Sequence, residues 1–206
     1  MSDASPTWDP TQYSRYEAER DRPARDLLAQ LPDDLAPREI WDLGCGTGLH
    51  AARLKDRYPA AAVHGLDSSE EMLGQARALT SGVDWRRGDI ASWAPDQPAD
   101  LILANASLQW LPDHPTRIPR LAASLASGGV LAIQMPMAWE TLHHRTMREV
   151  AAEGPWAVHL AERETIKALL TSAGYYDLLP RPADRSTSGR SPISTRSAGP
   201  TPSWNG

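Results

Sequence analysis

The sequence of 206 residues has no phenylalanine, one cysteine, Cys45, and no lysine besides Lys55 and Lys167. A single cysteine excludes an internal disulfide framework and a metal site built from cysteines. No apolar run approaches the roughly 20 residues of a membrane-spanning helix, and the residues after Met1 lack the basic and apolar regions of a signal peptide. The net charge of −5 offers no global positive field to nucleic acid or to an anionic membrane. We therefore expect a water-soluble, cytoplasmic protein without nucleic-acid or membrane partners and, by default, a monomer.

What the sequence does contain is an alternation of short apolar runs with amphipathic stretches from residue 39 to residue 135. Strands separated in this way by helices connect through right-handed crossovers and form a parallel sheet. The fold class is therefore predicted as α/β, with a doubly wound, mostly parallel sheet. The strands are predicted over 39–44, 62–67, 83–87, 99–105 and 128–135, and the main helices over 48–58, 139–152 and 164–173.

The chain is predicted to divide into three unequal parts. Residues 1–38 form an N-terminal helical segment, in which Pro23 is placed for the first turn of a helix that runs to Leu31. Residues 39–180 form the α/β domain. Residues 181–206 are mostly Ser, Thr, Pro, Gly and Arg, and their few apolar residues follow no period. Such a segment cannot bury enough apolar surface to offset its ordering entropy, so it is predicted to be disordered.

The most informative segment is Asp42-Leu-Gly-Cys-Gly-Thr-Gly48, which follows one predicted strand and precedes one predicted helix. Glycines let the backbone turn tightly and let a ligand approach the amide hydrogens at a helix N-terminus. The dinucleotide fingerprint G-x-G-x-x-G would need glycine at position 49, where Leu49 stands. The pattern present is G-x-G-x-G with an acidic residue two positions ahead of it. It fits a loop over adenosine and a methionine-like tail better than one over a pyrophosphate.

Two carboxylates follow the next two predicted strands. Asp67 ends the second strand, where it can accept hydrogen bonds from both hydroxyls of a ribose. Asp89 follows the third strand and can accept from an adenine amino group, with Ile90 packed on the ring. Because the carboxyl ends of parallel strands meet at one edge, these features together predict a nucleoside site. Taken singly, the glycine loop is equally well explained as a tight turn, Asp67 as a helix cap beside the capping box of Ser68 and Glu71, and Asp89 as a turn residue.

Further segments are distinctive in residue type and spacing. They are Arg20-Asp-Arg-Pro-Ala-Arg25, Gly65-Leu-Asp-Ser-Ser69, Asn105-Ala-Ser-Leu-Gln-Trp-Leu-Pro-Asp-His114, Val130-Leu-Ala-Ile-Gln-Met-Pro136 and Met147-Arg-Glu-Val150. With the glycine loop, they resemble the class I S-adenosylmethionine-dependent methyltransferases and, among these, the trans-aconitate 2-methyltransferase family, over residues 8–179. The resemblance implies a Rossmann-like methyltransferase fold. It also implies methyl transfer from S-adenosyl-L-methionine to a carboxylate of trans-aconitate, or of a similar small polycarboxylic acid, which gives the monomethyl ester.

The resemblance also implies roles for individual residues. Around the cofactor it places Asp42, Gly44, Gly46, Gly48, Asp67, Ser68, Met72, Asp89, Ile90, Asn105 and Ala106. Candidate partners for the carboxylates of the substrate are Tyr13, Arg22, Trp139 and His143, although a solvated helix face explains His143 better. A carboxylate is already ionised at neutral pH, since its unperturbed pKa is about 4. We therefore expect no catalytic acid or base and no metal ion.

The chain departs from this family near its end. Family members continue for roughly 50 residues more, with the last two strands of the sheet and part of the substrate pocket. Here the sequence after Leu179 becomes rich in Ser, Arg and Pro. We therefore expect a sheet without its last strands, an exposed edge at the fifth strand, and a tail from about residue 181 that is a frameshift product.

Several other functions stay open as alternatives. A shortened chain could bind the cofactor without turnover, or it could methylate another small molecule. A nicotinamide-dependent oxidoreductase is disfavoured by Leu49 and by the lack of a Tyr-x-x-x-Lys pair. A nucleic-acid methyltransferase is disfavoured by the negative net charge and by the absence of a basic, aromatic-rich appended domain.

Overall fold

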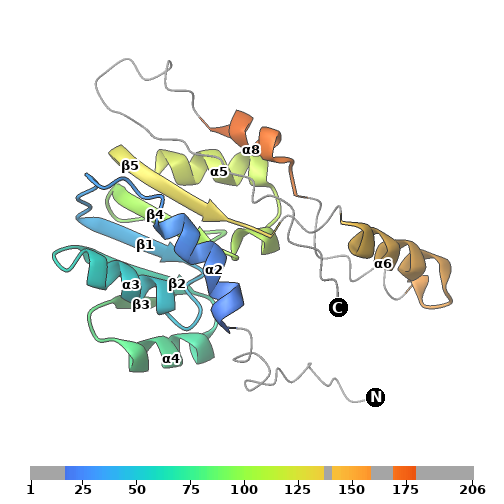
Figure 1. Cartoon of the computed structure of the whole chain (residues 1–206), viewed down its shortest axis with the longest axis horizontal. Helices are drawn as coiled ribbons and strands as arrows, with labels where there is room; N and C mark the ends of the chain where they lie inside the picture. Colours follow the sequence, from blue (N-terminus) through green and yellow to red (C-terminus); the bar gives the residue numbers. More distant parts are fainter. Residues whose placement is uncertain (1–16, 137–140, 159–168, 180–206) are drawn as a thin grey trace.

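The computed structural model describes residues 17–136, 141–158 and 169–179. They form a five-stranded sheet in the order β3-β2-β1-β4-β5, in which all neighbouring strands pair in parallel (Figure 1). The predicted α/β class is thereby confirmed. The strands are β1 (Glu39–Leu43), β2 (Ala62–Asp67), β3 (Asp84–Arg87), β4 (Ala99–Asn105) and β5 (Leu125–Gln134).

No helix in these described ranges has both the length and the apolar character that crossing a membrane requires.

Helices cover both faces of this sheet. On one face Ile40 of β1 packs with Leu54 of α3, and on the other face Leu43 of β1 packs with Ile118 of α5. This alternation follows from the period of two along a strand. The helices are α2 (Glu17–Leu28), α3 (Leu49–Arg57), α4 (Glu70–Leu79), the 3-10 turn η1 (Leu108–Trp110), α5 (His114–Ala123), α6 (Leu142–Glu153) and α8 (Ser172–Leu178).

The N-terminal helix starts earlier than the sequence predicts. α2 begins at Glu17, so Pro23 lies inside the helix and not in its first turn. Proline removes one backbone donor from a helix, but Pro23 is exposed. The opposite side of the helix is held by packing, because Ala24 and Leu28 are buried, as is Leu31 just beyond the helix end. The burial of this apolar side outweighs the local cost of the proline.

The start of α4 corrects the predicted capping residue. Ser69 is the N-cap, and its Oγ accepts a hydrogen bond from the Met72 backbone N–H at 3.3 Å, whereas Ser68 is exposed. The shift follows from Asp67, whose Oδ1 accepts from the Ser69 backbone N–H at 2.9 Å. This side-chain bond to the backbone sets the turn one residue further along the chain.

The C-terminal elements differ most from the sequence-based expectations. The strand predicted from residue 128 begins at Leu125, and within the described sheet it forms an edge, because β5 pairs with β4 alone. The helix predicted over 164–173 is wrong at residues 169–171, which are not helical, and only its last two residues coincide with α8, which begins at Ser172. The remainder of that helix and the tail over 181–206, predicted to be disordered, lie outside the described residues.

Candidate functional site

The predicted ligand loop joins β1 to α3 at the carboxyl edge of the sheet. Gly44, Gly46 and Gly48 have positive φ values of 76°, 54° and 84°, a conformation that strains other residues. A Cβ on Gly44 would lie 2.3 Å from the Ser107 Cβ, and one on Gly48 would lie 2.5 Å from the Trp85 ring. A Cβ on Gly46 would meet nothing within 4 Å. Packing therefore requires two of these glycines, while Gly46 borders open space.

Asp67, the last residue of β2, is hydrogen-bonded to the glycine loop. Its Oδ2 accepts a hydrogen bond from the Gly46 backbone N–H at 2.8 Å, while its Oδ1 is bonded to the Ser69 N–H at the start of α4. A carboxylate offers about four lone-pair positions, so each oxygen can accept one further hydrogen bond. Asp67 thus shapes the loop and can also accept from a pair of ligand hydroxyls. Beside it, Ser68 is exposed and Met72 is half-buried.

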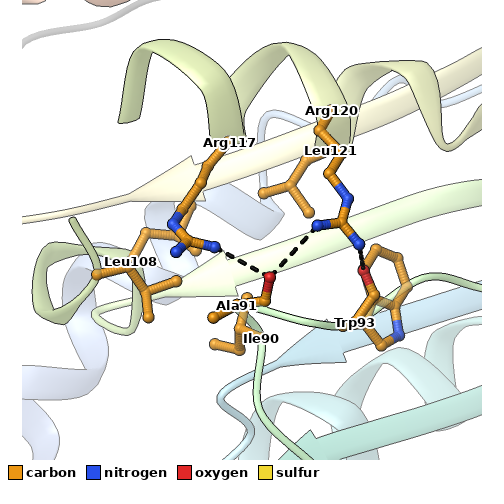
Figure 2. Close-up of a pocket in the computed structure, with 8 residues that line it drawn as sticks. Ile90, Ala91, Trp93, Leu108, Arg117, Arg120 and Leu121 are labelled. Carbon is orange, nitrogen blue, oxygen red and sulfur yellow. Dashed lines mark hydrogen bonds between the residues drawn. The ribbon is translucent and has the colours of Figure 1, made fainter. Parts of the chain in front are cut away.

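Asp89 and Ile90 lie on the loop that follows β3. Asp89 is exposed, and its Oδ1 accepts a hydrogen bond from the Ala91 backbone N–H at 2.8 Å. Ile90 is half-buried and lines a small hollow between this loop and α5, together with residues that include Leu108 and Leu121 (Figure 2). The loop therefore presents one carboxylate next to an apolar side chain, the combination expected for an adenine ring.

Two arginines of α5 hold this loop in place. Arg117 donates a hydrogen bond to the Ala91 carbonyl at 3.0 Å, and Arg120 donates to the same carbonyl at 3.3 Å (Figure 2). Arg120 also donates to the Trp93 carbonyl at 2.8 Å. The two guanidinium groups therefore bind the backbone of the loop and fasten it to the helix.

Replacing Arg120 by alanine should loosen this loop. The Trp93 carbonyl would lose its charged donor, so we expect the free energy of unfolding to fall by about 1 kcal/mol and the amides of residues 90–93 to exchange about fivefold faster. Chemical denaturation and hydrogen exchange measure the two effects. Arg77→Ala, at an exposed arginine of α4 that pairs with Glu70, is the matched control and should change neither. Unchanged exchange in Arg120→Ala would contradict the proposed fastening.

The end of β4 combines a strained residue with an unpaired acceptor. Ala106 has a positive φ of 51°, and its N–H donates to the Gln134 carbonyl at 2.9 Å. Ser107 follows, and its Oγ donates to the Leu43 carbonyl at 2.6 Å. The Oδ1 atom of Asn105 is buried, and none of the described residues gives it a hydrogen bond. Backbone strain beside an unpaired buried acceptor is typical of a ligand-binding position.

His50 contacts Asn105 although the sequence did not single it out. It is the second residue of α3, and its Nε2 lies 3.2 Å from the Asn105 Nδ2. Burial lowers the pKa of His50, an effect that the Asp21 carboxylate opposes and Arg53 reinforces. Its position directly after the glycine loop is the feature of the sequence that could have identified it as a candidate. Only the packing of α3 shows that the side chain reaches β4.

Asp42 lies buried under the glycine loop. Burial raises its pKa to about 7, the charge of Asp67 adds to this rise, and a hydrogen bond from the Ala51 backbone N–H opposes it. Its Oδ2 has no hydrogen-bond partner among the described residues. Cys45 is also buried, and burial raises the pKa of its thiol, which agrees with the predicted packing role better than with a nucleophile.

The raised pKa of Asp42 should make stability depend on pH. Between the unfolded pKa of 3.8 and the folded pKa of about 7, the folded state holds a proton that the unfolded state has lost. This contribution to stability is therefore lost as pH rises through that window, by about 2 kcal/mol between about pH 5 and about pH 6.5. Urea unfolding across this range should show the decline, and Asp42→Asn should remove it. Equal slopes in the two proteins would contradict the prediction, and Asp56→Asn at an exposed site serves as control.

The structure describes two of the four predicted substrate-binding residues, and both are exposed. Arg22 is exposed on α2, with its Nε 3.8 Å from an Asp26 carboxylate oxygen. His143 is exposed on α6, which stands apart from the sheet in Figure 1. Tyr13 and Trp139 lie outside the described residues.

Among the residues that the structure describes, no group of three or more side chains could hold a metal ion.

Comparison with known proteins identifies relatives of this chain. Residues 40–129 match the family described as a methyltransferase domain. Over 175 residues, the chain is 52% identical to trans-aconitate 2-methyltransferase from Azoarcus sp. (strain BH72), a match that covers 84% of this chain and 68% of that protein. It is 48% identical over 179 residues to trans-aconitate 2-methyltransferase from Yersinia pestis (strain Pestoides F), with coverage of 86% and 69%.

A solved structure shows the same fold. The plantazolicin methyltransferase BpumL, in complex with SAH, aligns with a TM-score of 0.58 and 22% sequence identity. The alignment covers 83% of this chain and 69% of that one. At this identity the likeness concerns the fold and carries nothing about the substrate.

Proposed function

The chain belongs to the trans-aconitate 2-methyltransferase family of S-adenosylmethionine-dependent methyltransferases, and from this premise we propose that it methylates a carboxylate of trans-aconitate or of a similar small polycarboxylic acid. The observation that carries the proposal is the high identity to relatives of that name, which extends over most of this chain. The cofactor site described above supports the same reaction.

The carboxyl edge of the sheet suits a positively charged nucleoside. Gly46 leaves open space beside the loop, Asp67 keeps free acceptor positions, and the Asn105 Oδ1 is a buried acceptor without a described partner. We propose that the glycine loop and Asn105 hold the methionine end and that Asp67 holds the ribose. Asp89 and Ile90 would then hold the adenine. The site is completed by Asp42, Gly44, Gly48, Ser68, Met72 and Ala106.

The chemistry needs little from the side chains of the protein. S-adenosylmethionine supplies, when bound, a methyl group on a sulfonium, and the electron pair of the broken C–S bond stays on sulfur. A carboxylate with a pKa of about 4 is ionised at neutral pH and needs no base to activate it. The residues around the site therefore act by holding the two reactants in line and by keeping water away.

Incubation of the purified chain with S-adenosylmethionine and trans-aconitate tests the proposal. Mass spectrometry should detect the monomethyl ester and an equal amount of S-adenosylhomocysteine. Citrate and tricarballylate, which lack the planar double bond, are the comparison acids and should react more slowly. If an ester formed only from another acid, that acid would be the substrate instead of trans-aconitate. Cofactor binding without any ester would favour the alternative of a binding protein without turnover.

A further inference from the structure

A line of polar side chains runs from α2 through α3 to the end of β4. Asp21 of α2 places its Oδ1 3.8 Å from the Nδ1 of His50, and the Nε2 of His50 lies 3.2 Å from the Nδ2 of Asn105. The side chains of Asp21 and His50 are only 8% and 16% exposed. The imidazole ring thus lies between a carboxylate of the N-terminal helix and the proposed cofactor site, and its Nδ1 has no hydrogen-bond partner among the described residues.

The charges around His50 decide which ring nitrogen carries the proton. Burial raises the pKa of Asp21, but the hydrogen bond from Arg53 and the charges of Arg53, His50 and Arg25 together lower it, so this carboxylate is ionised. A carboxylate facing Nδ1 favours the proton on that nitrogen. The Nε2 atom of the neutral ring is then an acceptor, which suits the N–H donor of the Asn105 amide.

We propose that His50 is a positioning residue for the methionine end of the cofactor, because its Nε2 holds the Asn105 amide with Oδ1 turned toward the positive charges of the ligand. The inference rests on the cofactor site of the proposed function and not on the identity of the acid. The buried Oδ1 of Asn105 has no hydrogen-bond partner in the described part of the chain, so the ligand would supply the missing one.

Protonation of His50 should reverse this arrangement. A protonated ring donates from Nε2, so Asn105 would have to turn its carbonyl to the histidine and its NH₂ group to the cationic ligand. The charged groups that act on His50 are Asp21 from α2 and Arg53 from α3, while Arg25 of α2 pairs with Asp21 and Asn105 of β4 is neutral. Because burial lowers the pKa of His50, the neutral ring prevails at pH 7 and the change is expected on acidification.

Two nucleosides and two variants separate this role from a structural one. S-adenosylhomocysteine carries the amino-acid end, and 5′-methylthioadenosine lacks it. In calorimetric titrations at about pH 7.5, His50→Leu should bind S-adenosylhomocysteine about tenfold more weakly and bind methylthioadenosine as the wild type does. His50→Gln keeps an acceptor for the Asn105 amide and should stay within about threefold of the wild type for both nucleosides.

The pH profile gives a second readout. Affinity of the wild type for S-adenosylhomocysteine should fall on acidification, by about tenfold once the His50 ring is protonated, whereas His50→Gln should lose much less. Asp42, whose pKa is about 7, titrates in both proteins, so the difference between the two pH profiles is due to His50. Nitrogen chemical shifts of the imidazole should report the proton on Nδ1 at neutral pH.

The outcomes separate the inference from the proposed function. Equal loss of both nucleosides in His50→Leu, no loss of either, or the same pH profile in His50→Gln and the wild type would each overturn the role of His50. If His50→Leu does not fold, the His50→Gln profile and the imidazole shifts still decide. A wild type that shows the expected binding pattern but methylates no acid would overturn the proposed function alone. A folded wild type that binds neither nucleoside would overturn both.

Discussion

Gly44→Ala should abolish most cofactor binding and also destabilise the protein. Gly44 has a φ of 76°, and an added Cβ would lie 2.3 Å from the Ser107 Cβ and 3.3 Å from the Ile90 Cδ1. Ser107 cannot simply move, because its Oγ is bonded to the Leu43 carbonyl at 2.6 Å. We expect the free energy of unfolding to fall by about 3 kcal/mol, from the left-handed backbone and the overlap together.

The displaced loop should weaken S-adenosylhomocysteine binding about 100-fold, because its backbone would no longer lie where the ligand approaches it. Denaturation and calorimetric titration measure the two effects. Gly74→Ala is the matched control: Gly74 lies in α4, and its Cβ would meet nothing within 4 Å, so alanine should be neutral or slightly stabilising. In Gly44→Ala/Ser107→Gly, part of the loss should return because the overlap is gone. Wild-type affinity in Gly44→Ala alone would refute the loop assignment.

Asp67→Asn should produce the second large loss. The carboxylate accepts from two backbone amides, those of Gly46 at 2.8 Å and Ser69 at 2.9 Å. An asparagine side chain has a single oxygen, so one amide would face an NH₂ group and stay unpaired. We expect the free energy of unfolding to fall by about 2 kcal/mol. The affinity for S-adenosylhomocysteine should fall about 50-fold, because the ribose would also lose an acceptor.

A ligand without the ribose hydroxyls makes this test specific. The 2′,3′-dideoxy form of S-adenosylhomocysteine should bind the wild type weakly, and Asp67→Asn should weaken it by a much smaller factor, because the ribose contact is already absent and only the disturbed loop adds to the loss. Asp56→Asn makes the same chemical change at an exposed position of α3 and should leave binding and stability unchanged. If Asp67→Asn weakened both ligands by the same factor, Asp67 would act only through the loop.

The glycine loop and the strand ends beside it could be predicted because their parts are local. The spacing of glycines between Gly44 and Gly48 specifies a sharp turn, and the positions of Asp67 and Asn105 at strand ends follow from runs of apolar residues. A parallel sheet then brings these strand ends together without further information. The candidates for binding the acid came from the resemblance and from chemical type, and neither determines how a side chain packs. The structure leaves Arg22 and His143 exposed.

The α/β class, the order of strands and helices over most of the chain, and the glycine loop with its acidic partners could all be predicted from the amino-acid sequence. These features depend on periodicity and on residues close together in the chain. Four features became visible only in the folded protein: Pro23 lies inside α2, Arg120 fastens the Asp89 loop, burial raises the pKa of Asp42, and His50 contacts Asn105. Each of these depends on segments far apart in sequence, because burial and the meeting of side chains are set by how helices pack on the sheet and not by local pattern.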